Sequence, residues 1–333
     1  MYSDKELSAA VEAGIFTDDS ASQFRAFTSK EHSIVSDSEE QFRLVTGFND
    51  IFVVIACLLL LISIAWLGGG FFGSLAVTAA SWGLAEIFVR KRKMALPAIV
   101  LFVTFINGVG FFVAFLFYKA GTNPSNPSIL ALLTIGLSTA LAARLHWLRF
   151  AVPITVAVAI GSVVGCIIAM FMSQFPNIKQ WSYALFLIGG FVSFLLAMYW
   201  DSQDVHRKTQ KSDIAFWLHL LAAPLIVHSI FSMLGIFEGT GGIFMALVVV
   251  SLYILLAIIS IVIDRRALMV SSLAYVLYAL TDLFKIYGMV HLSLAVSGIL
   301  IGSILLLLSA FWQIFRLFLL RYLPKSIKKY LPA

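Results

Sequence analysis

Charged side chains are scarce in this sequence of 333 residues. Asp, Glu, Lys and Arg make up 12% of the chain, whereas soluble globular proteins carry about a quarter. Hydrophobic residues account for 61%, and the mean hydropathy is +0.98. Such a composition is typical of a chain whose solvent is lipid rather than water. The sequence therefore predicts an integral membrane protein.

Cysteine is also scarce, and familiar catalytic motifs are missing. Cys57 and Cys166 both lie within apolar runs, which indicates neither a disulfide framework nor a paired metal site. The sequence has no HExxH zinc motif, no GxSxG nucleophile motif and no phosphate-binding loop. We therefore expect no enzymatic activity, no cofactor and no metal. The net charge of +6 does not indicate a nucleic-acid partner, because the basic residues lie in short turns between apolar runs.

Long apolar runs dominate the sequence after Asp50. A helix needs about 20 mostly apolar residues to cross a bilayer. Runs such as the one at 51–65 do not alternate between apolar and polar side chains, so they favour helices over barrel strands. The sequence predicts an all-α bundle of about ten transmembrane helices, at residues 49–68, 71–89, 95–118, 128–147, 152–172, 182–200, 214–235, 242–264, 267–288 and 291–319.

Lysine and arginine indicate the orientation, because cytoplasmic loops collect them. If the N-terminus is cytoplasmic, all but three of the 23 basic residues fall in segments on that side. The exceptions are Lys119, Lys179 and Lys285. A missed or extra helix would place the later basic segments on the wrong side, so this separation also favours ten crossings. We expect both termini in the cytoplasm and the chain in the cell inner membrane.

Polar segments flank the predicted transmembrane domain, which covers residues 49–323. Residues 1–48 are expected to form a cytosolic helical hairpin and linker, in which Gly14 ends the first helix and Thr17 opens the second. Because a hairpin of this length buries little apolar surface by itself, we expect it to dock on the membrane domain or on a cytosolic protein partner. Residues 324–333 are expected to form a basic cytosolic tail.

The predicted ninth span, residues 267–288, carries polar side chains on one helical face. These side chains recur every three or four residues: Ser271, Tyr275, Tyr278, Asp282 and Lys285. Asp282 and Lys285 are spaced to pair, which lowers the cost of placing charge in a membrane. The pattern indicates either the wall of a polar cavity or a polar seam between packed helices.

Two histidines lie in the predicted seventh span. The spacing of His219 and His228 places them on opposite faces of an ideal helix, and Pro224 between them predicts a kink. His228 shares its depth with the approach to Asp282, so it is a candidate for a proton or substrate path, or for hydrogen-bonded packing. We expect His219 to be an interfacial anchor.

Two other polar residues stand out within predicted spans. Glu86 precedes Arg90 by one helical turn, which predicts an ion pair along one helix. Asn107 lies beside Gly108 and Gly110, where close helix approach or a locally loosened helix is expected.

Three segments carry a resemblance to a known family. The stretch 6–27, with Val-Glu-Ala-Gly-Ile at 11–15, resembles the short cytosolic hairpin of a family of bacterial predicted multi-pass membrane proteins of unknown function. EQFRLVTGFNDIF at 40–52 and AFWLHLLAAPLIVH at 215–228 look like segments of such proteins from Gram-negative bacteria. The resemblance implies an inner-membrane protein and transfers no catalytic residue. By architecture alone, an arrangement of ten transmembrane helices with both termini in the cytoplasm is similar to that of the drug and metabolite transporter superfamily.

These observations favour a permease-like protein for a small solute. The candidate substrate or proton path comprises Tyr275, Tyr278, Asp282, Lys285, His228 and Asn107. The alternative is a membrane-embedded signalling or assembly protein that binds a cytosolic partner through its N-terminal hairpin. A membrane enzyme acting on lipid ranks third, because no acid, base and nucleophile converge at one depth.

The orientation can be tested with reporter fusions. Green fluorescent protein fused after Lys93 or Arg266 should fluoresce, and alkaline phosphatase fused after Ala120 or Lys179 should be active, because each reporter works on one side of the membrane only. Active phosphatase after Lys93 would contradict the predicted orientation.

Overall fold

The computed structural model describes residues 7, 10–24, 48–121, 128–174, 181–207, 209–236, 242–286, 292–324, 328 and 331. Within these ranges the regular structure is helical and contains no strand. The chain divides into two compact units, one within Met1–Gln41 and the other within Phe42–Pro332. The second unit contains all the long apolar helices.

The first unit contains two short helical segments, at residues 10–12 and 18–24. The Gly14 amide donates to the Val11 carbonyl at 3.0 Å, which closes the first segment. The Ser20 amide donates to Thr17 Oγ1 at 3.2 Å, and the Thr17 amide donates to Ser20 Oγ at 2.9 Å. Gly14 and Thr17 thus end and begin helices as their positions predict. Much of the predicted hairpin and linker, and most of the predicted tail, lies outside the described residues.

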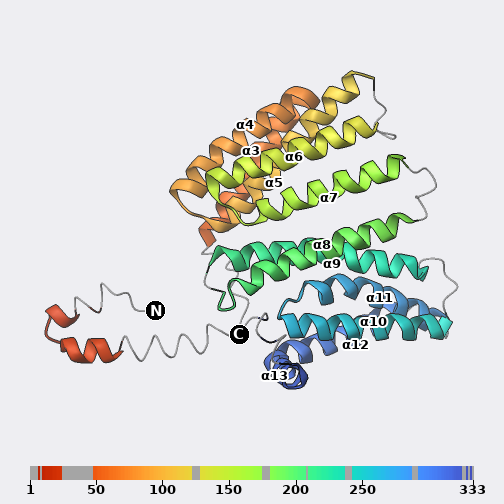
Figure 1. Ribbon diagram of the computed structural model, residues 1–333. Helices are drawn as coiled ribbons and strands as arrows, with labels where there is room; N and C mark the ends of the chain where they lie inside the picture. Colours follow the sequence, from red (N-terminus) through yellow and green to blue (C-terminus); the bar gives the residue numbers. More distant parts are fainter. Residues whose placement is uncertain are drawn as a thin grey trace. The chain divides into compact units, whose positions relative to one another are not determined.

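The second unit is built from antiparallel helices that follow one another along the chain (Figure 1). These helices are α3 (Phe48–Gly68), α4 (Ser74–Ala85), α5 (Ala95–Lys119), α6 (Ile129–Phe150), α7 (Ile154–Gln174), α8 (Ser182–Ser202), α9 (Gln210–Met233), α10 (Gly242–Ile263), α11 (Ala267–Ile286), α12 (Ser293–Ala310) and α13 (Trp312–Tyr322). Two short π-helices, Gly69–Gly73 and Glu86–Lys91, follow α3 and α4.

Nine helical stretches of the described chain are long and apolar enough to cross a membrane. The first, Phe48–Lys91, has 44 residues. As one straight helix it would measure about 66 Å, about twice the thickness of a hydrocarbon core. However, Gly69 has a φ of +62°, and α3 packs against α4. The chain turns back at Gly69–Gly73, so this stretch holds two helices. Ten crossings follow if each of the two crosses separately.

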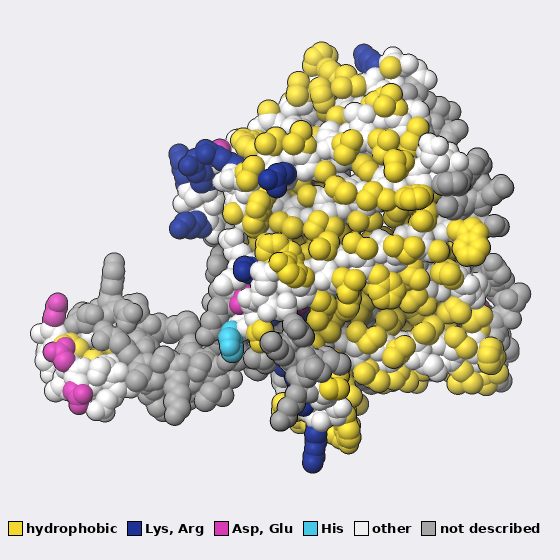
Figure 2. Space-filling model, viewed as in Figure 1, with side chains coloured by type: hydrophobic (Ala, Val, Ile, Leu, Met, Phe, Trp, Pro, Cys, Tyr) yellow, Lys and Arg dark blue, Asp and Glu magenta, His cyan; other side chains and the backbone are white. Residues whose placement is uncertain are grey.

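Helix α9 forms the centre of the second unit. It contacts α7, α8 and α11, and it lies between the earlier and the later helices (Figure 1). Of its most apolar 18-residue window, 56% is buried, compared with 17–33% for the other candidate spans. The face of the unit seen in Figure 2 is largely hydrophobic, and most of the Lys and Arg side chains visible there gather at one end. We call the end at which α4, α6, α8 and α10 finish the basic end, because Arg90, Arg149, Arg207 and Arg266 lie near the ends of these helices in the chain.

The predicted last span, residues 291–319, is too long. Helix α12 ends at Ala310, and Phe311 leaves helical geometry with φ −107° and ψ 16°. A separate helix, α13, then begins at Trp312 and runs in a different direction (Figure 1). The physical reason is that Trp312 Nε1 donates to the Asp264 carboxylate at 2.7 Å, which holds the start of α13 against the turn between α10 and α11.

Gly190 on α8 allows the close packing of α8 on α9. A Cβ atom at this position would lie 2.8 Å from Ile226 Cγ1 and 3.0 Å from the Ile226 backbone nitrogen. Both distances are too short, so one helix would have to move. By contrast, a Cβ atom at Gly165 on α7 would meet nothing within 4 Å.

Gly190→Ala should therefore lower the thermal stability of the purified protein by several degrees. Gly165→Ala is the matched control, and it should leave stability unchanged or raise it, because alanine is the better helix former by about 1 kcal/mol. Stability is measured as the fraction that stays monodisperse in detergent after heating. Equal stability of the two variants would contradict the close approach at Gly190.

Candidate functional site

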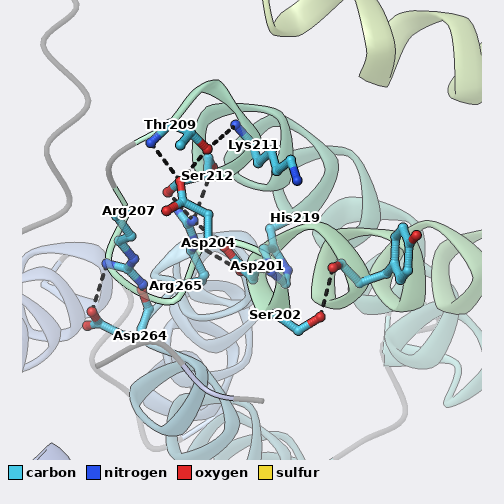
Figure 3. A network of polar contacts seen from close by, with 11 residues as sticks. Asp201, Ser202, Asp204, Arg207, Thr209, Lys211, Ser212, His219, Asp264 and Arg265 are labelled. Atoms are coloured by element: carbon cyan, nitrogen blue, oxygen red, sulfur yellow. Dashed lines mark hydrogen bonds and ion pairs between the residues drawn. The ribbon is translucent and has the colours of Figure 1, made fainter. Parts of the chain in front are cut away.

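A network of buried charges lies at the basic end of α8 and α9 (Figure 3). Asp201, near the end of α8, has a side chain that is 1% exposed. It accepts hydrogen bonds from Arg265 Nη2 at 2.6 Å and Nε at 3.2 Å, and its Oδ2 lies 2.9 Å from His219 Nε2. Arg265 also donates to the hydroxyl and carbonyl oxygens of Ser212 at 3.0 and 3.1 Å. Asp201 therefore joins α8, α9 and the turn before α11.

A second group of bonds extends the network to α13. Arg207 donates to the Asp264 carboxylate at 2.8 Å and to the Asp264 carbonyl at 2.9 Å. Trp312 Nε1 donates to the same carboxylate at 2.7 Å. Asp204 accepts from the amide and the hydroxyl of Thr209, both at 2.7 Å. The α8–α9 loop, the α10–α11 turn and the start of α13 are thus fastened together.

Backbone geometry shows that these bonds hold the loops in an uncommon conformation. Arg207 and Asp264 have φ angles of 51° and 54°, in the left-handed region that side chains other than glycine seldom adopt. Such a conformation costs on the order of 1 kcal/mol and persists where surrounding contacts impose it. We call the set Asp201, Asp204, Arg207, His219, Asp264 and Arg265 the charge network.

The charge network was only partly visible in the sequence. The prediction for His219 was wrong, because its side chain is 1% exposed and bonds to Asp201 rather than anchoring at an interface. In the sequence, Arg207 and Arg265 indicate only the orientation, and no local pattern distinguishes Asp201 or Asp264. Their one signal is that acidic residues occur beside basic residues at the ends of three predicted spans.

A second polar cluster lies farther along the same three helices. His228 Nδ1 on α9 is 2.6 Å from the Tyr275 hydroxyl on α11. The ring of Tyr183, from the start of α8, meets the His228 ring edge to face at 5.9 Å. Phe231 stacks on Tyr275 at 4.7 Å, and Ser232 Oγ lies 3.5 Å from His228 Nε2. His228 is exposed, in contrast to His219 on the opposite face of α9. We call this set the histidine–tyrosine cluster.

The remaining predicted path residues are distributed unevenly. Tyr278, which is 39% exposed, and the half-buried Asp282 follow Tyr275 along α11. The Lys285 side chain, and with it the predicted pair with Asp282, lies outside the described residues. Asn107 lies on α5, where its Nδ2 donates to the Val103 carbonyl at 2.8 Å. It lines a groove of about 590 Å³ formed by α3, α4 and α5, so the structure does not bring it to the other candidates.

The predicted ion pair of Glu86 with Arg90 is confirmed at 3.4 Å. Glu86 makes a shorter pair with Arg149 of α6, at 2.7 Å, which the sequence did not reveal. Nearby, His146 is fully buried among Trp82, Phe102, Phe105 and Phe150, and neither ring nitrogen has a hydrogen-bond partner among the described residues. His146 therefore packs as an aromatic ring.

The fold defines the class of protein. Apolar helices of membrane-spanning length, an apolar outer surface and a basic end describe a multi-pass α-helical membrane protein in contact with a lipid bilayer. The chain matches no known family model, no curated protein and no solved structure.

Asp201→Asn should strongly destabilise the protein. It removes the carboxylate from a buried arginine, and an uncompensated buried charge costs about 3–5 kcal/mol. Glu86→Gln is the matched control, because the same chemical change at a partly exposed pair costs about 1 kcal/mol or less. Thermal stability in detergent should fall far more in the first variant, and Asp201→Asn combined with Arg265→Gln should recover part of the loss. Equal losses at the two sites would contradict a buried, paired Asp201.

Proposed function

We propose that this chain is an inner-membrane permease for a small solute, with a path along α8, α9 and α11. One observation carries the proposal. α8, α9 and the turn that leads into α11 meet in the charge network at the basic end, and α8, α9 and α11 meet again in the accessible histidine–tyrosine cluster farther along. One end of the path is thus closed by charge pairs, and the other presents polar groups.

The exposure of His228 supports a water-filled mouth. Hydrocarbon offers no hydrogen-bond partner, so polar side chains within a span face a protein interior or water. His228 is exposed, and it shares its side of α9 with Tyr275 from α11. Tyr278 and Asp282 lie farther along α11. We propose that water and solute reach these residues, and that His228 carries a proton in the coupled step.

The charge network is suited to act as the inner gate. It fastens two loops and α13, so the basic end can open only when several strong bonds are released together. Alternating access requires a closed and an open arrangement, and in this proposal the bonds of the charge network make the closed one. In this proposal the chain crosses the membrane ten times with both termini in the cytoplasm, and the gate faces the cytoplasm. The small number of charges in the spans favours a neutral or zwitterionic solute.

A second function is favoured by the first unit. Ile15 is 72% exposed and Phe16 is 43% exposed, although both are large apolar residues. Neighbouring exposed apolar side chains on a small cytosolic unit suit the binding of a protein partner. In this alternative, the chain is a signalling or assembly protein, and the polar residues of α8, α9 and α11 only pack helices.

Water access along α11 tests the permease proposal. Single cysteines replace Tyr275, Tyr278 or Asp282 in a Cys57→Ala, Cys166→Ala background, and a membrane-impermeant maleimide is added from outside. All three should react, because thiols ionise only in contact with water. Leu255→Cys is the matched control, since Leu255 on α10 is 53% exposed and lies as far before the α10–α11 turn as Tyr275 lies after it, but it faces lipid in this proposal. Failure of Tyr275→Cys and Tyr278→Cys to react would indicate a dry seam.

Uptake into proteoliposomes separates the two functions. Labelled small neutral and zwitterionic solutes are offered with an imposed proton gradient. A permease should accumulate at least one of them, and Asp282→Asn or His228→Ala should abolish accumulation while leaving the protein folded. If both variants are silent in cells and deletion of residues 1–30 alone abolishes function, the signalling alternative is supported.

A further inference from the structure

A groove of about 740 Å³ runs along the outer side of α6, α7 and α8. It exists because α7 packs extensively on α6 but makes few contacts with α8. Leu141, Val163, Ile167 and Val192 line the groove, and each is an exposed side chain. The groove is therefore open to the surroundings of the bundle, which for these apolar helices is lipid.

The lining changes character along the length of the groove. At the basic end it contains Arg144 and Trp147 near the end of α6, together with Trp200 near the end of α8. Toward the other end the lining consists of alanine and leucine from α6, valine and isoleucine from α7 and valine from α8. The basic end of the groove can bind an anion, and the rest of the groove can only bury an apolar chain. The groove therefore complements an amphiphile that has an anionic headgroup and an apolar tail.

Arg144 differs from the neighbouring Arg149 in its partners. Arg149 is neutralised by Glu86 at 2.7 Å. Arg144 is exposed and makes no ion pair or hydrogen bond within the part of the chain that the structure describes. A guanidinium group presents paired donors that match a phosphate, and tryptophan favours the headgroup level of a bilayer. Arg144 is thus available for an anionic headgroup.

We infer that this groove is a binding site for an anionic phospholipid. The headgroup phosphate contacts Arg144 between the two tryptophans, and one acyl chain lies between α7 and α8. No residue of the charge network or of the histidine–tyrosine cluster lines the groove. The inference is therefore independent of the proposed transport function. A free phosphate ion would gain only the Arg144 contact, whereas the acyl chain adds apolar burial along the whole groove.

Native mass spectrometry of the detergent-purified protein tests the headgroup contact. Phosphatidylglycerol and phosphatidylcholine with identical acyl chains are titrated separately, and bound lipid is counted. The wild-type chain should retain phosphatidylglycerol in preference, and Arg144→Ala should weaken that binding about five-fold, the contribution of one surface cation. Arg144→Lys should retain part of the preference. Arg149→Ala is the matched control and should leave it unchanged, because Arg149 already has a carboxylate partner.

A second variant tests the acyl-chain contact. Val163→Trp fills the groove away from Arg144 and should reduce the binding of both lipids. Glycerol phosphate, which carries the headgroup chemistry without a chain, should not displace bound phosphatidylglycerol. The inference is overturned if Arg144→Ala and Arg149→Ala lower binding equally, if Val163→Trp has no effect, or if glycerol phosphate displaces the lipid.

Discussion

The hydrocarbon core of a bilayer provides no hydrogen-bond partners, and this constraint governs the arrangement of the second unit. A polar side chain on a buried helix must find its partner within the protein. Asp201 does so through Arg265 and His219, which come from segments before α11 and within α9. Because these partners lie on α9 and in the turn before α11, satisfying Asp201 also fixes how α8, α9 and that turn meet. The same bonds, extended through Asp264 to Trp312, explain why α13 leaves the direction of α12.

The constraint also gives the two histidines of α9 different environments. His219 lies on the buried face and is held by a carboxylate, whereas His228 lies on the accessible face with tyrosines. Charge pairs hold α9 at one end, and polar side chains lie on its accessible face toward the other end. A gated path requires such a difference between its two ends. His146 shows that burial of a histidine alone does not indicate such a role, because it is enclosed by aromatic rings.

In the lipid site that we infer, lipid is a ligand of this protein as well as its solvent. Arg149 and Arg144 lie near the same end of α6, yet one is paired with Glu86 and the other borders an open groove. A paired arginine has little left to offer a phosphate, whereas an arginine beside tryptophan at the end of an apolar groove can bind one. The difference depends on where α4 and α8 lie relative to α6, rather than on anything local to either arginine.

The class of protein and most of its helices could be predicted from the sequence, because a run of about 20 apolar residues has few alternatives to a membrane-spanning helix. Contacts within one helix could also be predicted, since helical geometry places residues one turn apart next to each other. The pair of Glu86 with Arg90 and the opposite faces of His219 and His228 are of this kind. The tertiary structure alone decided the pairing of Asp201 with Arg265, the bend between α12 and α13, and the separation of Asn107 from α11. These features depend on contacts between residues far apart in the chain, which no local periodicity records.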